Sequence, residues 1–179
     1  AFSRLCRLVP ALCPPVSRLS AQLVSSSDRV DEAHRIYATR RLVHFHEMEY
    51  SIPAEHFRTV IEEIQTLIKA RGFAVHFPLE CRFVKADSIP LSPAFGRDSA
   101  YIAVHMYQGM PYEAYFRELE AIFLSHEGRP HWGKWHSRTA QTLADRYPDW
   151  KQFQSLRNRL DPDGVFLTPY MKELLQTST

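Results

Sequence analysis

The chain has 179 residues, of which 45% are hydrophobic and 23% are charged, which is the composition of an ordinary soluble globular domain. A chain of this length can bury a hydrophobic core, which excludes collagen-like, disordered and small disulfide-stabilised proteins. Its 22 lysines and arginines nearly balance its 20 acidic residues, so a nucleic-acid partner is not expected.

The N-terminal residues 1–27 contain three arginines and no acidic residue, a composition similar to that of a mitochondrial transit peptide. Prolines interrupt the leucines here, so we expect short helical pieces and turns. The chain begins without an initiator methionine, which suggests a processed chain or a piece of a longer one. Its three cysteines cannot all pair, which favours a reducing compartment, and no apolar run is long enough for a transmembrane helix.

The segment 41–50 is rich in aromatic and β-favouring residues, so it is expected to form a strand that ends at Ser51-Ile52-Pro53. Pro53 is then expected near the first position of an amphipathic helix that stops at Gly72. The apolar side of this helix has residues at i, i+3, i+4 and i+7 spacing, namely Phe57, Val60, Ile61, Ile64, Leu67 and Ile68.

The segment 73–84 alternates between apolar and polar residues, which predicts a strand with one face on the core. Cys81 lies on the apolar face and is expected to be a small core residue, whereas Glu80 and Arg82 share the other face. Because Pro78 cannot donate to a β-ladder, the strand is expected at a sheet edge or to contain a bulge.

The segment 99–107 predicts another strand, with Ile102, Val104 and Met106 on the apolar face and Tyr101, Ala103, His105 and Tyr107 on the other. A second amphipathic helix is expected to follow Pro111 and to end before Gly128. This order of strands and helices, with short connections, predicts an α+β fold: an antiparallel sheet with amphipathic helices on one side.

The rest of the chain is expected to be a helical C-terminal tail. Ser137 is expected to cap a short helix, residues 148–160 form a second, and Thr168-Pro169 begins a third after a turn at 161–164. The predicted organisation has three parts: a helical lead-in at 1–40, an α+β sheet layer at 41–127, and a loop with the helical tail at 128–179.

Glu80 and Arg82 are two residues apart on one strand face, so their side chains point the same way. Such a pair can bind a polyol or sugar, because the carboxylate accepts a hydrogen bond from a hydroxyl while the guanidinium donates to an oxygen and favours negative charge there. The commoner meaning of this spacing is a solvated surface ion pair.

The hexapeptide Arg-Pro-His-Trp-Gly-Lys at 129–134 combines a rigid proline, a flexible glycine and functional side chains in a loop after a helix. Lys134 could place a positive charge beside a bound cofactor or anion. The alternative, which composition alone favours, is that Trp132 anchors the loop to the core.

The nine histidines do not define a metal site at this stage. His44 and His46 share a strand face, and His131 and His136 share a loop, but neither pair has a zinc-type spacing. We therefore expect no metal. The sequence also lacks glycine-rich nucleotide-binding motifs and the nucleophile motif of serine hydrolases.

Five segments occur in an order that resembles the C-terminal substrate domain, or cap domain, of the sugar-1,4-lactone oxidases. These are FAD-linked oxidases of the vanillyl-alcohol-oxidase type, and the group includes D-arabinono-1,4-lactone, L-gulono-1,4-lactone and alditol oxidases. The segments are Phe45 to Pro53 (FHEMEYSIP), Glu80-Cys81-Arg82, Leu91-Ser92-Pro93, Arg129 to Lys134 (RPHWGK) and Leu160 to Phe166 (LDPDGVF). The resemblance covers nearly the whole chain and replaces the transit-peptide interpretation of residues 1–27 with that of an interior segment.

The resemblance implies that Glu80 and Arg82 bind and orient substrate hydroxyls and that Arg82 also stabilises the alkoxide. It makes Lys134 a neighbour of the flavin N1/O2 edge. The reaction implied is oxidation of a CH–OH group by hydride transfer to FAD, with oxygen as the expected acceptor. The weaker candidates are His131 and Trp132 on the cofactor side, and His105 and Tyr107 in the wall of the substrate pocket.

In such an enzyme, FAD is held mainly by an N-terminal FAD-binding domain that these 179 residues do not contain. That domain is expected in the same or a separate polypeptide. The alternatives are an alditol oxidase acting on xylitol or sorbitol, a non-catalytic sugar-binding cap domain, and a structural subunit that completes a separate FAD domain. The expected location is the cytoplasm, and peripheral membrane contact stays open.

Overall fold

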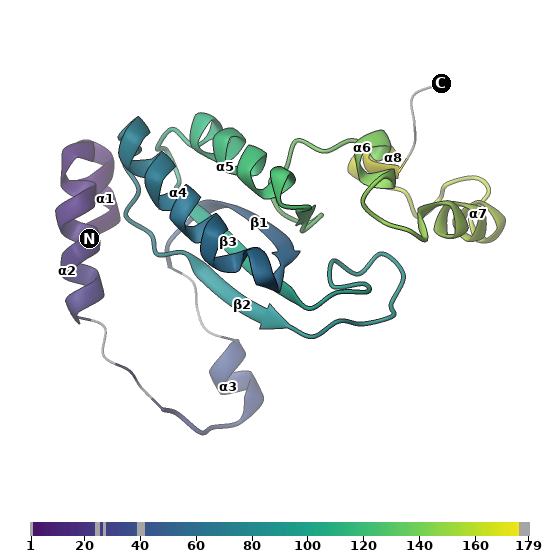
Figure 1. Cartoon of the computed structure of the whole chain (residues 1–179), viewed down its shortest axis with the longest axis horizontal. Helices are drawn as coiled ribbons and strands as arrows, with labels where there is room; N and C mark the ends of the chain where they lie inside the picture. Colours follow the sequence, from purple (N-terminus) through teal and green to yellow (C-terminus); the bar gives the residue numbers. More distant parts are fainter. Residues whose placement is uncertain (1, 24–25, 27, 39–41, 176–179) are drawn as a thin grey trace.

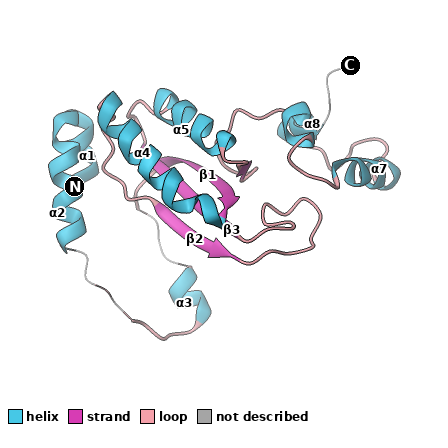
Figure 2. Ribbon diagram, viewed as in Figure 1, coloured by secondary structure: helices cyan, strands magenta, loops and turns pink. Residues whose placement is uncertain are grey.

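The structure, a computed structural model, describes residues 2–23, 26, 28–38 and 42–175 (Figure 1). An antiparallel four-stranded sheet has the order β2-β3-β1-β4, and helices α4 and α5 cover one of its faces (Figure 2). The predicted α+β fold is confirmed. The elements are α1 (Phe2–Leu8), η1 (Pro10–Leu12), α2 (Cys13–Leu23), α3 (Ala33–Tyr37), β1 (Phe45–Pro53), η2 (Ala54–His56), α4 (Phe57–Arg71), β2 (Glu80–Val84), β3 (Ser99–Tyr107), α5 (Glu113–Ser125), β4 (Arg129–Pro130), α6 (Ala140–Ala144), α7 (Trp150–Leu160) and α8 (Pro169–Leu175).

The main core lies between the sheet and helices α4 and α5. Every second residue of β1 and β3 points into it, and the ring of Tyr50 on β1 stacks on Phe123 of α5 with 5.2 Å between centroids. The predicted apolar face of β3 is confirmed by the burial of Ile102, Val104 and Met106. Helix α4 ends at Gly72, as predicted, where a φ of +65° favours glycine.

The N-terminal residues form short helices, as expected, and part of them belongs to the core. Cys6 of α1 and Cys13 at the start of α2 are fully buried against it, and Val16 is partly buried there. In the described part of the chain, no helix combines the length and the apolarity needed to cross a bilayer.

A second, smaller core joins the C-terminal helices. Its buried members are Ala140, Leu143, Tyr147, Trp150, Leu174 and Leu175. The partly buried Trp132 packs against this cluster and so attaches the preceding loop to it. The helical tail is thus confirmed, with α8 beginning at Pro169 as predicted.

The strand prediction for residues 73–84 is wrong over its first half. Only Glu80–Val84 forms strand β2, because residues 73–79 pack on the core as a loop and Pro78 cannot donate to a ladder. The edge position suggested by Pro78 is confirmed. The predicted burial of Cys81 was also wrong. Because β2 lies at the sheet edge, Cys81 is exposed, and Phe83 is 65% exposed although its ring packs on that of Phe57 in α4.

Three smaller differences concern element ends. Strand β1 covers Phe45–Pro53 rather than 41–50, because the pairing with β3 continues to Pro53; residue 41 lies outside the described residues. The cap of α6 is Thr139 instead of Ser137, whose hydroxyl donates to Glu120. Part of the predicted loop, Arg129–Pro130, pairs with β1 as strand β4.

Gly128 connects α5 to β4 in a position where no side chain fits. A Cβ atom there would lie 2.5 Å from the carbonyl oxygen of Phe123 and 2.9 Å from the ring of Tyr50. Its N–H also donates to the Phe123 carbonyl at 2.8 Å. Glycine at this position therefore fixes how the chain passes from the helix layer back to the sheet.

We expect Gly128→Ala to lower the free energy of unfolding by about 2–3 kcal/mol, because the added methyl group must displace backbone or a buried ring. Urea unfolding followed by circular dichroism measures this. The control is Ser155→Ala on the exposed surface of α7, which should change stability by less than about 0.5 kcal/mol. Equal stability of both variants would contradict the close packing at Gly128.

Candidate active site

The sheet face opposite the helices carries a row of charged side chains. Glu49 on β1 pairs with Ala103 on β3, which in turn pairs with Glu80 on β2. Because directly paired residues point to the same face, the small side chain of Ala103 separates two carboxylates. In the adjacent rows, Glu47 pairs with His105, and Tyr101 pairs with Arg82.

Glu49 is the centre of an ion-pair network. It is only 1% exposed, and its two carboxylate oxygens contact Lys134 Nζ and an Arg82 guanidinium nitrogen. Lys134 also donates to Glu47 at 2.6 Å, and His105 Nε2 lies 3.2 Å from the same Glu47 oxygen. One buried carboxylate thus ties β1 to β2 and to the loop after β4.

The charges of this network change the pKa values of Glu49 and Arg82. Burial acts to raise the pKa of Glu49, but the hydrogen bond and charge of Lys134, together with Arg82, leave it below its ordinary value. Burial acts to lower the pKa of Arg82, yet the neighbouring Glu49 carboxylate leaves that pKa raised. Glu49 is therefore anionic and Arg82 cationic at neutral pH.

The backbone of β1 positions the loop that carries Lys134. The Glu49 carbonyl accepts from His131 N–H at 2.9 Å, and the Glu47 carbonyl accepts from Trp135 N–H at 2.9 Å. The loop therefore follows the edge of β1 beyond the two residues of β4. This brings the Lys134 ammonium to the side chains of the same two glutamates.

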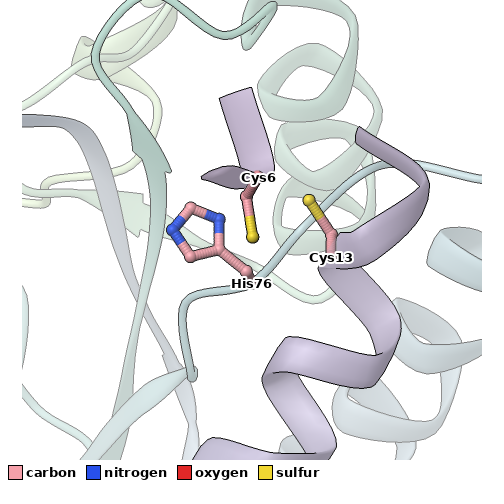
Figure 3. Close-up of side chains that lie close together, drawn as sticks. All are labelled: Cys6, Cys13 and His76. Atoms are coloured by element: carbon pink, nitrogen blue, oxygen red, sulfur yellow. The ribbon is translucent and has the colours of Figure 1, made fainter. Parts of the chain in front are cut away.

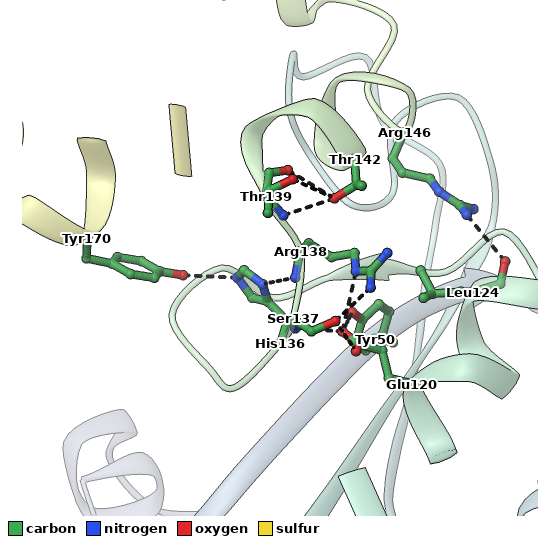
Figure 4. A network of polar contacts seen from close by, with 10 residues as sticks. All are labelled: Tyr50, Glu120, Leu124, His136, Ser137, Arg138, Thr139, Thr142, Arg146 and Tyr170. Atoms are coloured by element: carbon green, nitrogen blue, oxygen red, sulfur yellow. Dashed lines mark hydrogen bonds and ion pairs between the residues drawn. The ribbon is translucent and has the colours of Figure 1, made fainter. Parts of the chain in front are cut away.

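A second buried carboxylate fixes the chain after this loop (Figure 4). Glu120 on α5 accepts hydrogen bonds from the Tyr50 hydroxyl at 2.5 Å and from the Ser137 N–H at 2.8 Å. Farther along, His136 Nε2 lies 3.0 Å from the Tyr170 hydroxyl of α8. The segment that carries Lys134 is thus held at β1 on one side and at α5 and α8 on the other.

The structure brings together four of the residues selected from the sequence. Glu80 Oε1 lies 3.8 Å from Arg82 Nε, and Arg82 and Lys134 share Glu49. His105 joins them through Glu47. The pair at 80 and 82 is therefore part of a larger charged cluster, more than an isolated surface ion pair.

Three other candidates have different surroundings. Tyr107 lines a hollow with Arg4 and Arg7 of α1 rather than the Glu49 cluster. The Trp132 indole donates to the Tyr147 hydroxyl at 3.2 Å, so it anchors the loop, as the alternative interpretation expected. His131 is exposed, and its Nδ1 accepts from the Gly133 N–H at 3.1 Å.

Glu47 and Glu49, which hold the candidate site together, were not among the residues selected from the sequence. The available signal was their spacing, because they are two residues apart on a predicted strand, as Glu80 and Arg82 are. Both strand faces of this segment contain polar residues, so the pattern alone did not identify the exposed face. Pairing with β3 resolves the ambiguity, since Met48 and Tyr50 are fully buried on the helix side.

We expect Glu49→Gln to destabilise the chain by about 3 kcal/mol at pH 7, because it leaves two cations without the buried carboxylate that they share. Since folding lowers the pKa of Glu49, its contribution is full above the unfolded value of about 4.3 and disappears as pH falls through the folded value. The unfolding curves of the two proteins should therefore converge in acid.

Denaturant titrations between neutral and acidic pH check this expectation. Glu80→Gln is the matched control, because Glu80 is 52% exposed and its loss should cost less than about 1 kcal/mol. A stability difference for Glu49→Gln that persists unchanged into strong acid would show that the carboxylate charge is not the cause.

The chain is similar over most of its length to enzymes that act on sugar lactones and alditols. It is 47% identical over 169 residues to L-gulono-1,4-lactone dehydrogenase of Mycobacterium tuberculosis, covering 94% of this chain and 40% of that protein. It is 34% identical over 172 residues to L-gulonolactone oxidase of Scyliorhinus torazame, covering 92% and 39%. It is 32% identical over 130 residues to alditol oxidase of a Streptomyces species, covering 71% and 31%.

The chain thus spans about 40% of the length of the first two of these relatives. A family match extends the similarity to the N-terminal helices. The family described as D-arabinono-1,4-lactone oxidase matches residues 1–174, which includes every element of the described structure except the last residue of α8. The chain therefore belongs to the D-arabinono-1,4-lactone oxidase family.

Proposed function

We propose that this chain is the substrate-binding cap domain of an FAD-dependent oxidoreductase that oxidises a CH–OH group of a sugar-1,4-lactone. The observation that supports this most directly is the cluster of Glu80, Arg82 and Lys134 around the buried Glu49. The residues that the family resemblance selected come from β2 and from a loop about 50 residues later, and they meet on one open face. Family membership gives the reaction class.

Glu80 and Arg82 are suited to bind the substrate. Their side chains are 52% and 53% exposed, so both can reach a ligand that lies over the sheet. Glu80 would accept a hydrogen bond from a sugar hydroxyl, and Arg82 has N–H groups beyond the one that contacts Glu49. If the hydroxyl proton passes to water or to a base outside this chain before the hydride leaves the carbon, the permanent charge of Arg82 would stabilise the resulting alkoxide oxygen.

Lys134 fits a position beside the cofactor ring. An ammonium group has three N–H donors, and within the described part of the chain Glu47 and Glu49 accept two of them. The third is left for an acceptor such as the N1/O2 edge of a flavin, and Lys134 is 19% exposed on this face. Bound FAD would supply the hydride acceptor, and the lysine charge would favour the negative charge of the reduced ring.

Most of the FAD contacts are expected to come from a separate domain. The Mycobacterium tuberculosis relative matches this chain over only 40% of its length, so the larger part of that protein is unmatched and is long enough for a further domain. We place the corresponding domain of this enzyme in the same or a separate polypeptide. This FAD-binding domain would cover the charged face of the sheet, where every residue of β2 is exposed in the present chain.

The names of the relatives bear on the terminal electron acceptor, the molecule that reoxidises the reduced flavin. Two of the relatives are named oxidases and one is named a dehydrogenase, so members of the family are named for different acceptors. We propose oxygen as the acceptor. Measurement of hydrogen peroxide formation by the complete enzyme during lactone turnover checks this proposal, and full activity only with an artificial dye would contradict it.

An alditol is the second candidate substrate, because the alditol oxidase of Streptomyces is 32% identical to the chain. Flavin reduction under anaerobic conditions distinguishes the two. We expect L-gulono- or D-arabinono-1,4-lactone to reduce the flavin of the complete enzyme at least about tenfold faster than xylitol or sorbitol, which corresponds to roughly 1.4 kcal/mol of preference. Faster reduction by the alditols would favour the alternative.

We expect substitution of the three site residues to slow flavin reduction in the complete enzyme that contains this chain. Lys134→Ala, Glu80→Gln and Arg82→Ala should each reduce the rate roughly 100-fold, because each removes a charged group that contacts substrate or cofactor. Stopped-flow absorbance of the flavin under anaerobic conditions measures the rate. The lactone concentration should be varied to separate binding from the reduction step.

The matched control is Lys85→Ala, which removes a lysine that is 91% exposed and paired with Asp98 near the end of β2. Its rate of flavin reduction should equal that of the wild type. Unchanged flavin reduction in all three site variants would overturn the proposed roles, whereas loss of bound flavin in Lys134→Ala alone would restrict that residue to cofactor binding.

A further inference from the structure

Three side chains that can ligate metals meet beside the N-terminal helices, outside the charged cluster (Figure 3). Cys6 comes from α1, Cys13 from the first position of α2, and His76 from the loop between α4 and β2. Their sulfur and imidazole nitrogen atoms all lie within 4.8 Å of one another. Residues 70 positions apart in the sequence therefore point into one small volume.

The cluster is buried. Cys6 and Cys13 have no exposed surface, and His76 is 9% exposed. Neither ring nitrogen of His76 has a hydrogen-bond partner among the described residues, although a buried polar group normally has one. Figure 3 shows the imidazole of His76 beside the two sulfur atoms. An ion bound between the three side chains would give one imidazole nitrogen the partner that it lacks.

Two other uses of these residues agree less well with their surroundings. Both cysteines are free thiols in the structure. A catalytic thiol is also disfavoured, because neither sulfur atom has surface that a substrate could reach. The aromatic neighbours of His76 include Phe77, with 4.6 Å between ring centroids, and such contacts do not satisfy its nitrogens.

We propose that Cys6, Cys13 and His76 bind a thiophilic metal ion, Zn²⁺ or Cu⁺. Two sulfur ligands and one imidazole match the preference of both ions. Ligand atoms around one such ion lie roughly 3.5–4 Å apart, given bond lengths of about 2.0–2.3 Å, so small side-chain rotations would close the site. Binding releases the thiol protons to solvent. Three ligands complete a trigonal Cu⁺ site, whereas Zn²⁺ takes a further ligand.

The ion would act as a structural clamp. It would connect α1 and α2 to the loop that leads into β2, the strand that carries Glu80 and Arg82. This proposal departs from the sequence-based expectation of no metal, which rested on local spacing. The distance along the chain between Cys13 and His76 explains why no short motif indicates the site.

The test uses the intact, reduced chain and measures bound metal. After incubation with Zn²⁺ or with Cu⁺ and removal of free ions, elemental analysis should find about one ion per chain for one of the two metals. Co²⁺ as a probe for the Zn²⁺ site should show thiolate-to-metal charge-transfer absorption. Retention of Zn²⁺ or Cu⁺ decides which ion the site prefers.

Variants locate the ion. Cys6→Ser, Cys13→Ser and His76→Gln should each reduce retained metal at least tenfold, whereas the controls Cys81→Ser and His126→Gln should retain it. Cys81 is an exposed cysteine, and His126 pairs with Glu63 away from the cluster. Thermal unfolding with and without the ion provides a second readout, because only proteins with the intact cluster should gain stability.

The proposal is overturned if the reduced wild-type chain retains neither metal, or if the cluster variants retain as much as the controls. If a cluster variant does not fold, the spectra of the wild-type chain decide, since absence of charge-transfer absorption with Co²⁺ and of thiolate-to-metal absorption in the ultraviolet with Cu⁺ excludes thiolate ligation of either ion. A disulfide between Cys6 and Cys13 that persists under reductant would also overturn it, and it would be seen as alkylation of Cys81 alone after the chain is denatured.

Discussion

The buried charge of Glu49 connects the fold to the site. A carboxylate that is 1% exposed is costly to bury, so it needs positive partners that remain charged. Those partners are Arg82 on the edge strand and Lys134 in a loop that follows the opposite edge of β1. Charge compensation at the Glu49 carboxylate therefore specifies where β2 and the loop with Lys134 lie relative to β1.

One face of the sheet contributes to the hydrophobic core, and the other carries the candidate site. The helix side holds the apolar side chains of β1 and β3, including Met48, Tyr50 and Ile102, which supply the main core. The other side has no helix layer in the described chain and carries the charged groups. Because successive strand residues alternate between faces, neighbouring residues such as Met48 and Glu49 serve the core and the site, respectively.

Sequence periodicity predicted the parts of the fold that pack in a regular way. Strand β3 was predicted with its observed ends because its core face is fully buried and both neighbours pair with it. The alternation at 73–79 was misleading, since those apolar residues pack on the core without a strand partner. The resemblance selected Glu80, Arg82 and Lys134 as candidates, but the position of Glu49 as the shared partner of Arg82 and Lys134, and the proximity of Cys13 to His76, required the three-dimensional arrangement.

The edge position of β2 has a consequence for handling the chain. Within the described sheet β2 pairs on one side only, so its outer N–H and C=O groups could template association with another strand. Pro78 before the strand, Lys85 after it, and the charges of Glu80 and Arg82 are features that discourage such pairing. The side chains proposed to bind substrate thus also keep this edge soluble, and apolar replacements there would promote aggregation as well as loss of binding.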